Sequence, residues 1–215
     1  MKTLSILALA AVTVFKVLAA PTATPQNILP PESGPLFFLR TFAPEQPWHG
    51  RHLVLLPSSR RLGLENFTVH PTTPPITFTP LQLASTSSFA LALPGGSDDE
   101  NQNPWLAAFK AHSSTTASFG TIVSLDPNDV KGTCPADVEE CQANGFTMYQ
   151  GQGGDPGLKR LSFDGFQGGA FQAVKDAPKG EGWHVYWRWT PDPVLVQIEF
   201  EVVPVTRLGE IVSEY

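Results

Sequence analysis

The sequence predicts an all-β fold, an antiparallel β-sandwich of the jelly-roll or immunoglobulin-like kind that carries one or two short helices. Short runs of β-branched and aromatic residues recur along the chain, and many of its 21 prolines lie between them. Residues 183–189 and 194–202 alternate apolar and polar side chains, as half-buried strands do. Short strands at this spacing, separated by turn-forming residues, are typical of a sandwich or barrel.

Residues 1–19 have the features of a cleavable signal peptide. Lys2 gives a basic start, residues 4–18 are mostly apolar, and Ala19 places a small residue before the cleavage site. The apolar run is shorter than the ~20 residues of a membrane-spanning helix, and Lys16 interrupts it. We therefore expect a secreted, extracellular protein with no membrane partner.

The rest of the chain divides into an arm and one domain. Residues 20–35 contain five prolines and are expected to form an extended arm. Residues 36–215 are long enough for a single well-buried domain. Strand candidates in the first part of this domain are 36–42, 52–56, 65–70, 76–79, 89–93 and 118–124. We see no internal repeat.

Two segments of the domain carry helix signals instead. Asn103 has the chemistry of an N-cap and Pro104 follows it at the first helical position, which predicts one or two helical turns over residues 103–112. Residues 135–143 are expected to form a second short helix or a turn.

The charge of the chain argues against a nucleic-acid partner. The signal peptide holds two of the 14 lysines and arginines, so 12 basic and 20 acidic residues remain, a net charge of −8. No cluster of basic residues exceeds two. Binding to phosphates needs a basic footprint, and we expect none here.

The two cysteines, Cys134 and Cys141, are expected to form a disulfide in an oxidising compartment. In one straight helix their Cα atoms would lie roughly 10 Å apart, at about 1.5 Å per residue. A disulfide needs less than about 7 Å. The bridge and an unbroken helix through these residues therefore exclude each other.

The alternating segments 183–189 and 194–202 are predicted to pair as a hairpin. In the register that sets apolar residues against one another, Trp187 faces Val196. A shift of one residue would set tryptophans against glutamates, so the hydrophobic pattern favours this register. An earlier two-residue hairpin turn is predicted at Asp164-Gly165.

The predicted hairpin has a second face that supplies the best site candidate. It would present His184, Tyr186, Arg188 and Glu199 together. Cβ atoms of His184 and Glu199 would then lie about 4.5–5.5 Å apart. A simply solvated sheet face is the alternative interpretation of the same pattern.

The five tryptophans divide between core and surface. Trp183, Trp187 and Trp189 share the side of the strand that is expected to face the core. Trp48 and Trp105 lie among prolines and polar residues, and they are the candidates for an aromatic ligand platform.

The segment Phe163-Asp-Gly-Phe-Gln-Gly-Gly-Ala-Phe171, followed by the tryptophan-rich strand, resembles the C-terminal half of an uncharacterised family of small secreted β-rich proteins from filamentous fungi. The resemblance covers roughly residues 36–205 and rests on glycine and aromatic spacings. It implies a β-sandwich and an extracellular setting, and it implies no activity.

Few motifs point to specific chemistry. Asn66-Phe67-Thr68 is an N-glycosylation sequon. His49 and His52 lack a third ligand with metal-site spacing, so we expect no metal and no cofactor. The chain has no Gly-x-Ser-x-Gly nucleophile motif.

Two functions follow as expectations. The first is a non-catalytic module that binds an extracellular glycan of a cell wall, or a host or neighbouring protein. The alternative is a secreted hydrolase that acts on an extracellular polymer with a carboxylate and His184. A surface cleft that holds His184 and two carboxylates would favour the enzyme, and a flat aromatic patch would favour the binding module.

Overall fold

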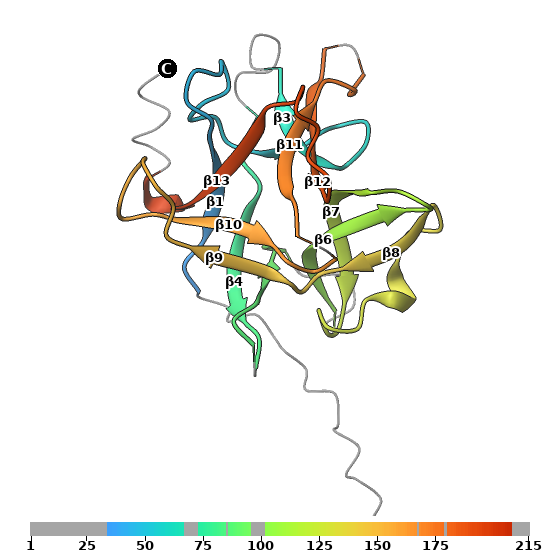
Figure 1. Ribbon diagram of the computed structural model, residues 1–215. Coiled ribbons are helices and arrows are strands. Elements are labelled where there is room, and N and C mark those ends of the chain that lie inside the picture. The colour runs from blue at the N-terminus through green and yellow to red at the C-terminus, as the bar shows by residue number, and fades with distance from the viewer. Residues whose placement is uncertain are drawn as a thin grey trace, which may run out of the picture.

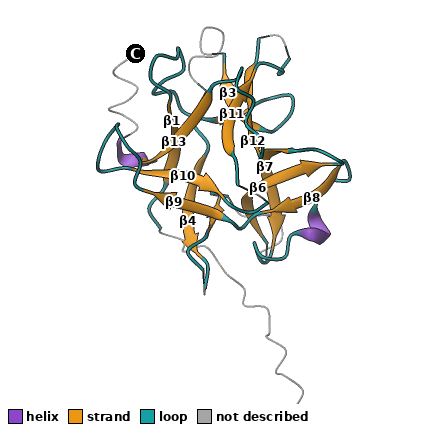
Figure 2. Ribbon diagram, in the orientation of Figure 1, coloured by secondary structure: helices purple, strands orange, loops and turns teal. Residues whose placement is uncertain are grey.

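The computed structural model describes residues 34–66, 73–84, 86–95, 102–166, 168–178 and 180–207. The predicted signal peptide, most of the proline-rich arm and the last eight residues of the predicted domain lie outside these ranges. The all-β antiparallel class is confirmed, and Figure 2 shows strands throughout the described chain. Helical residues in the described ranges are confined to two single turns of 3-10 helix, Lys131–Thr133 and Val205–Arg207.

The described residues form thirteen strands, and Figure 1 shows how most of them are arranged. They are β1 (Phe37–Phe42), β2 (Val54–Leu55), β3 (Leu62–Glu65), β4 (Thr77–Gln82), β5 (Phe89–Ala92), β6 (Asn103–Ala111), β7 (Thr116–Ser124), β8 (Val138–Gln142), β9 (Phe146–Tyr149), β10 (Lys159–Phe163), β11 (Ala170–Val174), β12 (Gly182–Arg188) and β13 (Gln197–Pro204).

All thirteen strands belong to one hydrogen-bonded network, in place of two separate sandwich sheets. Six of them close on themselves in the order β1, β4, β5, β9, β10 and β13, because β13 also pairs with β1. Closing a sheet in this way removes its edges, which leaves no unpaired strand in the ring. The barrel accounts for about half of the fold.

Six of the seven remaining strands form three pairs that cover the barrel. Each third of the chain gives two barrel strands with one pair between them, namely β2–β3, β6–β7 and β11–β12. Strand β12 pairs with both β3 and β7, so the three pairs meet at one end, and β8 adds to β6. This is the strand arrangement of a β-trefoil, formed here by a sequence without a visible repeat.

The main core is aromatic. The Phe119 ring lies 5.6 Å from that of Phe163 and 5.5 Å from that of Phe171. Trp187 is buried and its ring lies 4.9 Å from Phe171, so the predicted core side of β12 is confirmed there. Rings at these distances and tilted angles pack favourably beyond the area that they bury.

The helix predicted over residues 103–112 is wrong, because this segment is strand β6. Trp105 and Phe109 pack into one apolar cluster, while the intervening Leu106 and Ala108 pack into the main core. A strand that is buried on both faces has no apolar–polar alternation, so its sequence resembles a buried helix.

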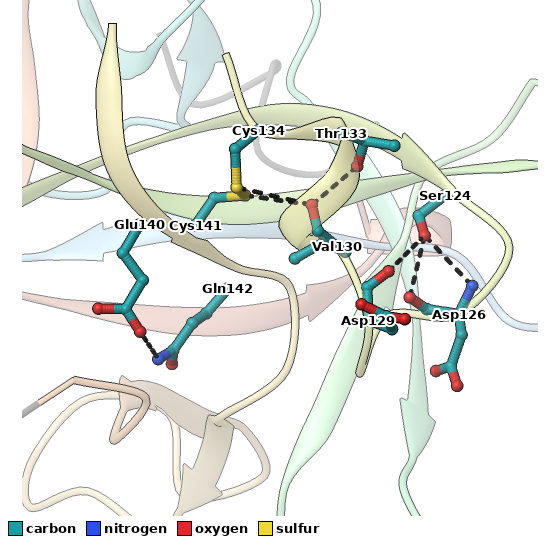
Figure 3. Close-up of a disulfide and its surroundings, with 9 residues drawn as sticks. All are labelled: Ser124, Asp126, Asp129, Val130, Thr133, Cys134, Glu140, Cys141 and Gln142. Carbon is teal, nitrogen blue, oxygen red and sulfur yellow. Dashed lines mark hydrogen bonds between the residues drawn. A yellow bond between two sulfur atoms is a disulfide. The ribbon is translucent and has the colours of Figure 1, made fainter. Parts of the chain in front are cut away.

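The disulfide is confirmed. Of the short helix or turn predicted over residues 135–143, only a turn at residues 135–138 is present, and strand β8 follows it. Cys134 and Cys141 are bridged, with their Cα atoms 5.8 Å apart (Figure 3). Cys141 lies in β8, an extended strand paired with β6. Both sulfur atoms contact the Val130 carbonyl oxygen at 3.5 Å, which anchors the 3-10 turn to the strand.

Both predicted hairpins are wrong. Strand β11 lies between β12 and β13, and Phe171 faces Trp187 on one side and Ile198 on the other. The Asp164-Gly165 segment is no hairpin turn, because β10 and β11 are separated by β13. Strand β11 also carries apolar side chains at its core positions, so the hydrophobic pattern of β12 fits it as well as it fits β13.

Candidate functional site

Of the four residues that were predicted to share one face, the structure keeps three on β12 and separates Glu199 from them. His184 and Tyr186 lie together on β12, and Arg188 ends the same strand, half-buried. Glu199 is on β13, where its carboxylate contacts Tyr149 and Arg160. The predicted contact between His184 and Glu199 is therefore wrong, because β11 lies between their strands.

The two tryptophans proposed as a ligand platform are not exposed. Trp105 is 0% exposed, and its indole N–H donates to the Ser124 carbonyl at 3.0 Å. Trp48 is half-buried and packs on Trp183, with ring centroids 5.5 Å apart. Trp105 is thus a core residue, and Trp48 joins the edge of the core.

The chain has a hollow of about 410 Å³ between β13, β11 and the end of β9. That volume is in the range of small-ligand sites. Its lining includes Phe42, Tyr149, Phe171, Trp187, Gln197 and Glu199. Of these, Phe171 and Trp187 are buried, while Tyr149 and Gln197 are exposed.

Glu199 is held in a fixed position at this hollow. The Tyr149 hydroxyl donates to Glu199 Oε1 at 2.9 Å, and the Arg160 guanidinium forms an ion pair with Oε2. The Glu199 side chain remains 44% exposed. Each carboxylate oxygen can accept two hydrogen bonds, so both keep an acceptor site for a ligand.

The loop between β9 and β10, which contains glycines, holds the Arg160 side chain in place. Arg160 donates to the carbonyl oxygens of Gln152 at 2.7 Å and Gly153 at 3.0 Å. A Cβ on Gly151 would lie 2.2 Å from the Arg160 Nε, so only glycine lets the loop approach this closely. A second ion pair, between Arg40 on β1 and the buried Glu201 on β13, at 2.6 Å, joins these two strands.

A second polar cluster lies around His184, at the end of the molecule where the three strand pairs meet. Its Nδ1 lies 2.7 Å from Asp176 Oδ1, and its Nε2 lies 2.9 Å from Ser59 Oγ. The Tyr186 hydroxyl donates to Asp176 Oδ2 at 2.7 Å. Burial, and then the hydrogen bond to Asp176, raise the pKa of Tyr186 well above its usual value, so its phenol stays protonated as a donor.

Sequence reasoning missed Ser59 and Asp176 here and Tyr149 and Arg160 at the hollow. No local motif marks any of them. Ser59 and His184 are 125 positions apart in the chain, and they meet because β3 pairs with β12. The signal that finds them is the strand pairing, which the local pattern does not specify.

Other predicted residues lie apart from both clusters. His49 accepts a hydrogen bond from the Ala43 amide, and His52 Nε2 lies 2.8 Å from the Thr73 carbonyl oxygen, so each has its own partner. Asn66 directly follows β3, and its backbone N–H donates to the Glu181 carbonyl oxygen at 2.9 Å. The sequon's Phe67 and Thr68 lie outside the described residues.

The chain matches no protein-family model, no curated protein and no solved structure in the comparisons made with each. Within the described ranges, no helix is long and apolar enough to cross a membrane.

Proposed function

We propose that this chain is a secreted binding protein whose hollow beside β13 takes a polyhydroxylated ligand, the exposed end of a cell-wall glycan. Secretion is supported by the signal-peptide features of residues 1–19 and by the disulfide. Cleavage after Ala19, glycosylation of Asn66 and a fungal source, which the family resemblance implies, belong to the same proposal.

The observation that carries the proposal is the paired Glu199 beside the exposed Tyr149 in a hollow lined by aromatic residues. The C–H face of a sugar ring packs on aromatic side chains, and its hydroxyls donate to carboxylates. The hollow offers the exposed ring of Tyr149 for the first contact and Glu199 for the second. Tyr149 and Arg160 already orient that carboxylate, so the Glu199 side chain loses little conformational entropy when a ligand binds.

The size of the hollow favours a glycan end over a protein partner. A stable protein interface needs roughly 800 Å² on each side. A hollow of about 410 Å³ instead suits a ligand of one or a few rings. Glu199, which was predicted to share a face with His184, lies at this hollow, while His184 pairs with Asp176 elsewhere, so the hollow itself holds no carboxylate–histidine pair.

A glycan-binding titration of the mature protein tests the proposal. Glu199→Gln keeps the shape of the side chain and removes its charge. It should weaken binding about tenfold or more, as loss of a charge-assisted hydrogen bond does. Glu139→Gln, at an exposed carboxylate paired with Lys110 on a different strand, is the matched control and should bind like the wild type. Folded protein that binds no wall glycan, or two variants of equal affinity, would contradict the proposal.

A further inference from the structure

We propose that Ser59 is an activated nucleophile that forms a covalent acyl adduct with carboxylic esters, at a site separate from the hollow. A nucleophilic serine needs a base within hydrogen-bond reach, and that base needs a group to orient it. Ser59 Oγ lies 2.9 Å from His184 Nε2, and His184 Nδ1 lies 2.7 Å from Asp176 Oδ1. The three side chains therefore stand in the order hydroxyl, imidazole and carboxylate.

The surrounding hydrogen bonds select the productive tautomer of the neutral imidazole. An ionised carboxylate only accepts hydrogen bonds, so Asp176 takes one from His184 Nδ1–H and one from the Tyr186 hydroxyl. The proton on Nδ1 leaves the lone pair of Nε2 directed at Ser59. The Arg61 amide donates to Ser59 Oγ at 3.2 Å, which leaves the hydroxyl hydrogen to point at the imidazole.

The loop that carries Ser59 is tied to β12 by its neighbours. The Ser58 hydroxyl and amide both donate to Glu181 Oε2, at 2.7 and 3.3 Å. Glu181 immediately precedes β12, which holds His184, so serine and base are fixed to one rigid element. The imidazole is mostly buried, at 11% exposed, whereas Pro57 and Ser58 are exposed and leave the loop open to solvent.

The acylation step balances with these groups alone. Ser59 Oγ attacks the carbonyl carbon of the ester, and its proton moves to His184 Nε2. The C–O bond to the leaving group then breaks, and Nε2 returns the proton to the departing alkoxide. Asp176 holds the imidazolium that forms between the two transfers. Water can then release the acyl group: its oxygen attacks the acyl carbon while its proton moves to His184 Nε2, and Nε2 returns that proton to Ser59 Oγ as the bond from the serine to the acyl group breaks.

Covalent labelling with an alkyl fluorophosphonate tests the assignment. In this reaction Ser59 Oγ attacks phosphorus and fluoride leaves, with the serine proton taken up by His184. Intact-mass analysis of the mature protein should show one adduct, and peptide mapping should place it on Ser59. Ser59→Ala should abolish the adduct, while Ser114→Ala, at a serine bonded to Thr116, should label like the wild type.

Two more variants separate activation from mere exposure of the hydroxyl. His184→Gln and Asp176→Asn should each slow labelling by about 100-fold or more, since the base or its orientation is lost. Asp176→Glu should recover part of the rate, and thermal unfolding should show that each variant is folded. Glu139→Gln, at a carboxylate outside both the hollow and this cluster, should label normally. An unlabelled Ser59 in folded wild type, or equal rates in wild type and His184→Gln, would overturn the assignment.

Discussion

Replacing Arg160 by methionine should destabilise the protein and loosen the rim of the hollow. Arg160 is 3% exposed, and its guanidinium lies 3.8 Å from the centroid of the Phe42 ring. It also donates to the carbonyl oxygens of Gln152 and Gly153 and pairs with Glu199. Methionine keeps a flexible apolar stem and removes the charge and every one of these hydrogen bonds.

The size of the loss follows from these contacts. Hydrogen bonds to a charged group contribute about 1.5–3 kcal/mol each, and the guanidinium over the ring adds about 1 kcal/mol. Gln152 and Gly153 are exposed, so water replaces part of what their carbonyl oxygens lose. Removing a buried cation also relieves its desolvation. We expect a net loss of about 3 kcal/mol, which lowers the Tm by roughly 6–12 °C in a domain of this size.

Urea and thermal unfolding of Arg160→Met measure this loss. Lys159→Met is the matched control, because Lys159 is the exposed neighbour on the same strand and its replacement should change stability by less than about 0.5 kcal/mol. Equal stability of the two variants would refute the role given to Arg160. Because Glu199 loses its ion pair, Arg160→Met should also weaken glycan binding.

Two further predictions concern the disulfide and the His184 cluster. Replacing Cys134 and Cys141 together by serine should lower the free energy of unfolding by about 2.5 kcal/mol, the chain-entropy value for a loop this short, and a change under about 0.5 kcal/mol in urea unfolding would contradict it. Because the pKa of Tyr186 is raised in the folded protein, its phenol ionises first in the unfolded chain as the pH rises. The stability that comes from burying the neutral phenol is therefore fully present below about pH 10 and is lost as the pH rises further. The free energy of unfolding should therefore fall less steeply above pH 10 in Tyr186→Phe than in wild type, and equal slopes would count against the burial of that hydroxyl.

Local patterns predicted the class of the fold and the orientation of one strand, and they failed at strand pairing. Trp187 faces the core as its alternation indicated. The partner predicted for its strand was wrong, because alternation shows which side of a strand is apolar and does not show which neighbouring strand pairs with it. Strand β6 was missed for the opposite reason, since burial of both faces erased the alternation.

The candidate sites depend on that same pairing. His184 was identified as a polar residue on a strand face, and its position beside Tyr186 followed from the spacing of two. Its partners Ser59 and Asp176 come from loops that the order of β3, β12 and β11 brings together. Trp105 was taken for a surface residue because prolines and polar residues lie near it in the sequence, yet it packs into an apolar cluster.

Titration of the isotope-labelled mature protein with chitin or glucan oligosaccharides, followed by NMR, tests the binding hollow most directly. The amide signals of Tyr149 and Gln197 and the indole N–H signal of Trp187 should shift in a saturable way, because these groups line the hollow. The same signals should stay in place for Glu199→Gln at ligand concentrations that saturate the wild type only partly. Saturable shifts confined to residues elsewhere, or no shifts with any wall oligosaccharide, would contradict the proposed site.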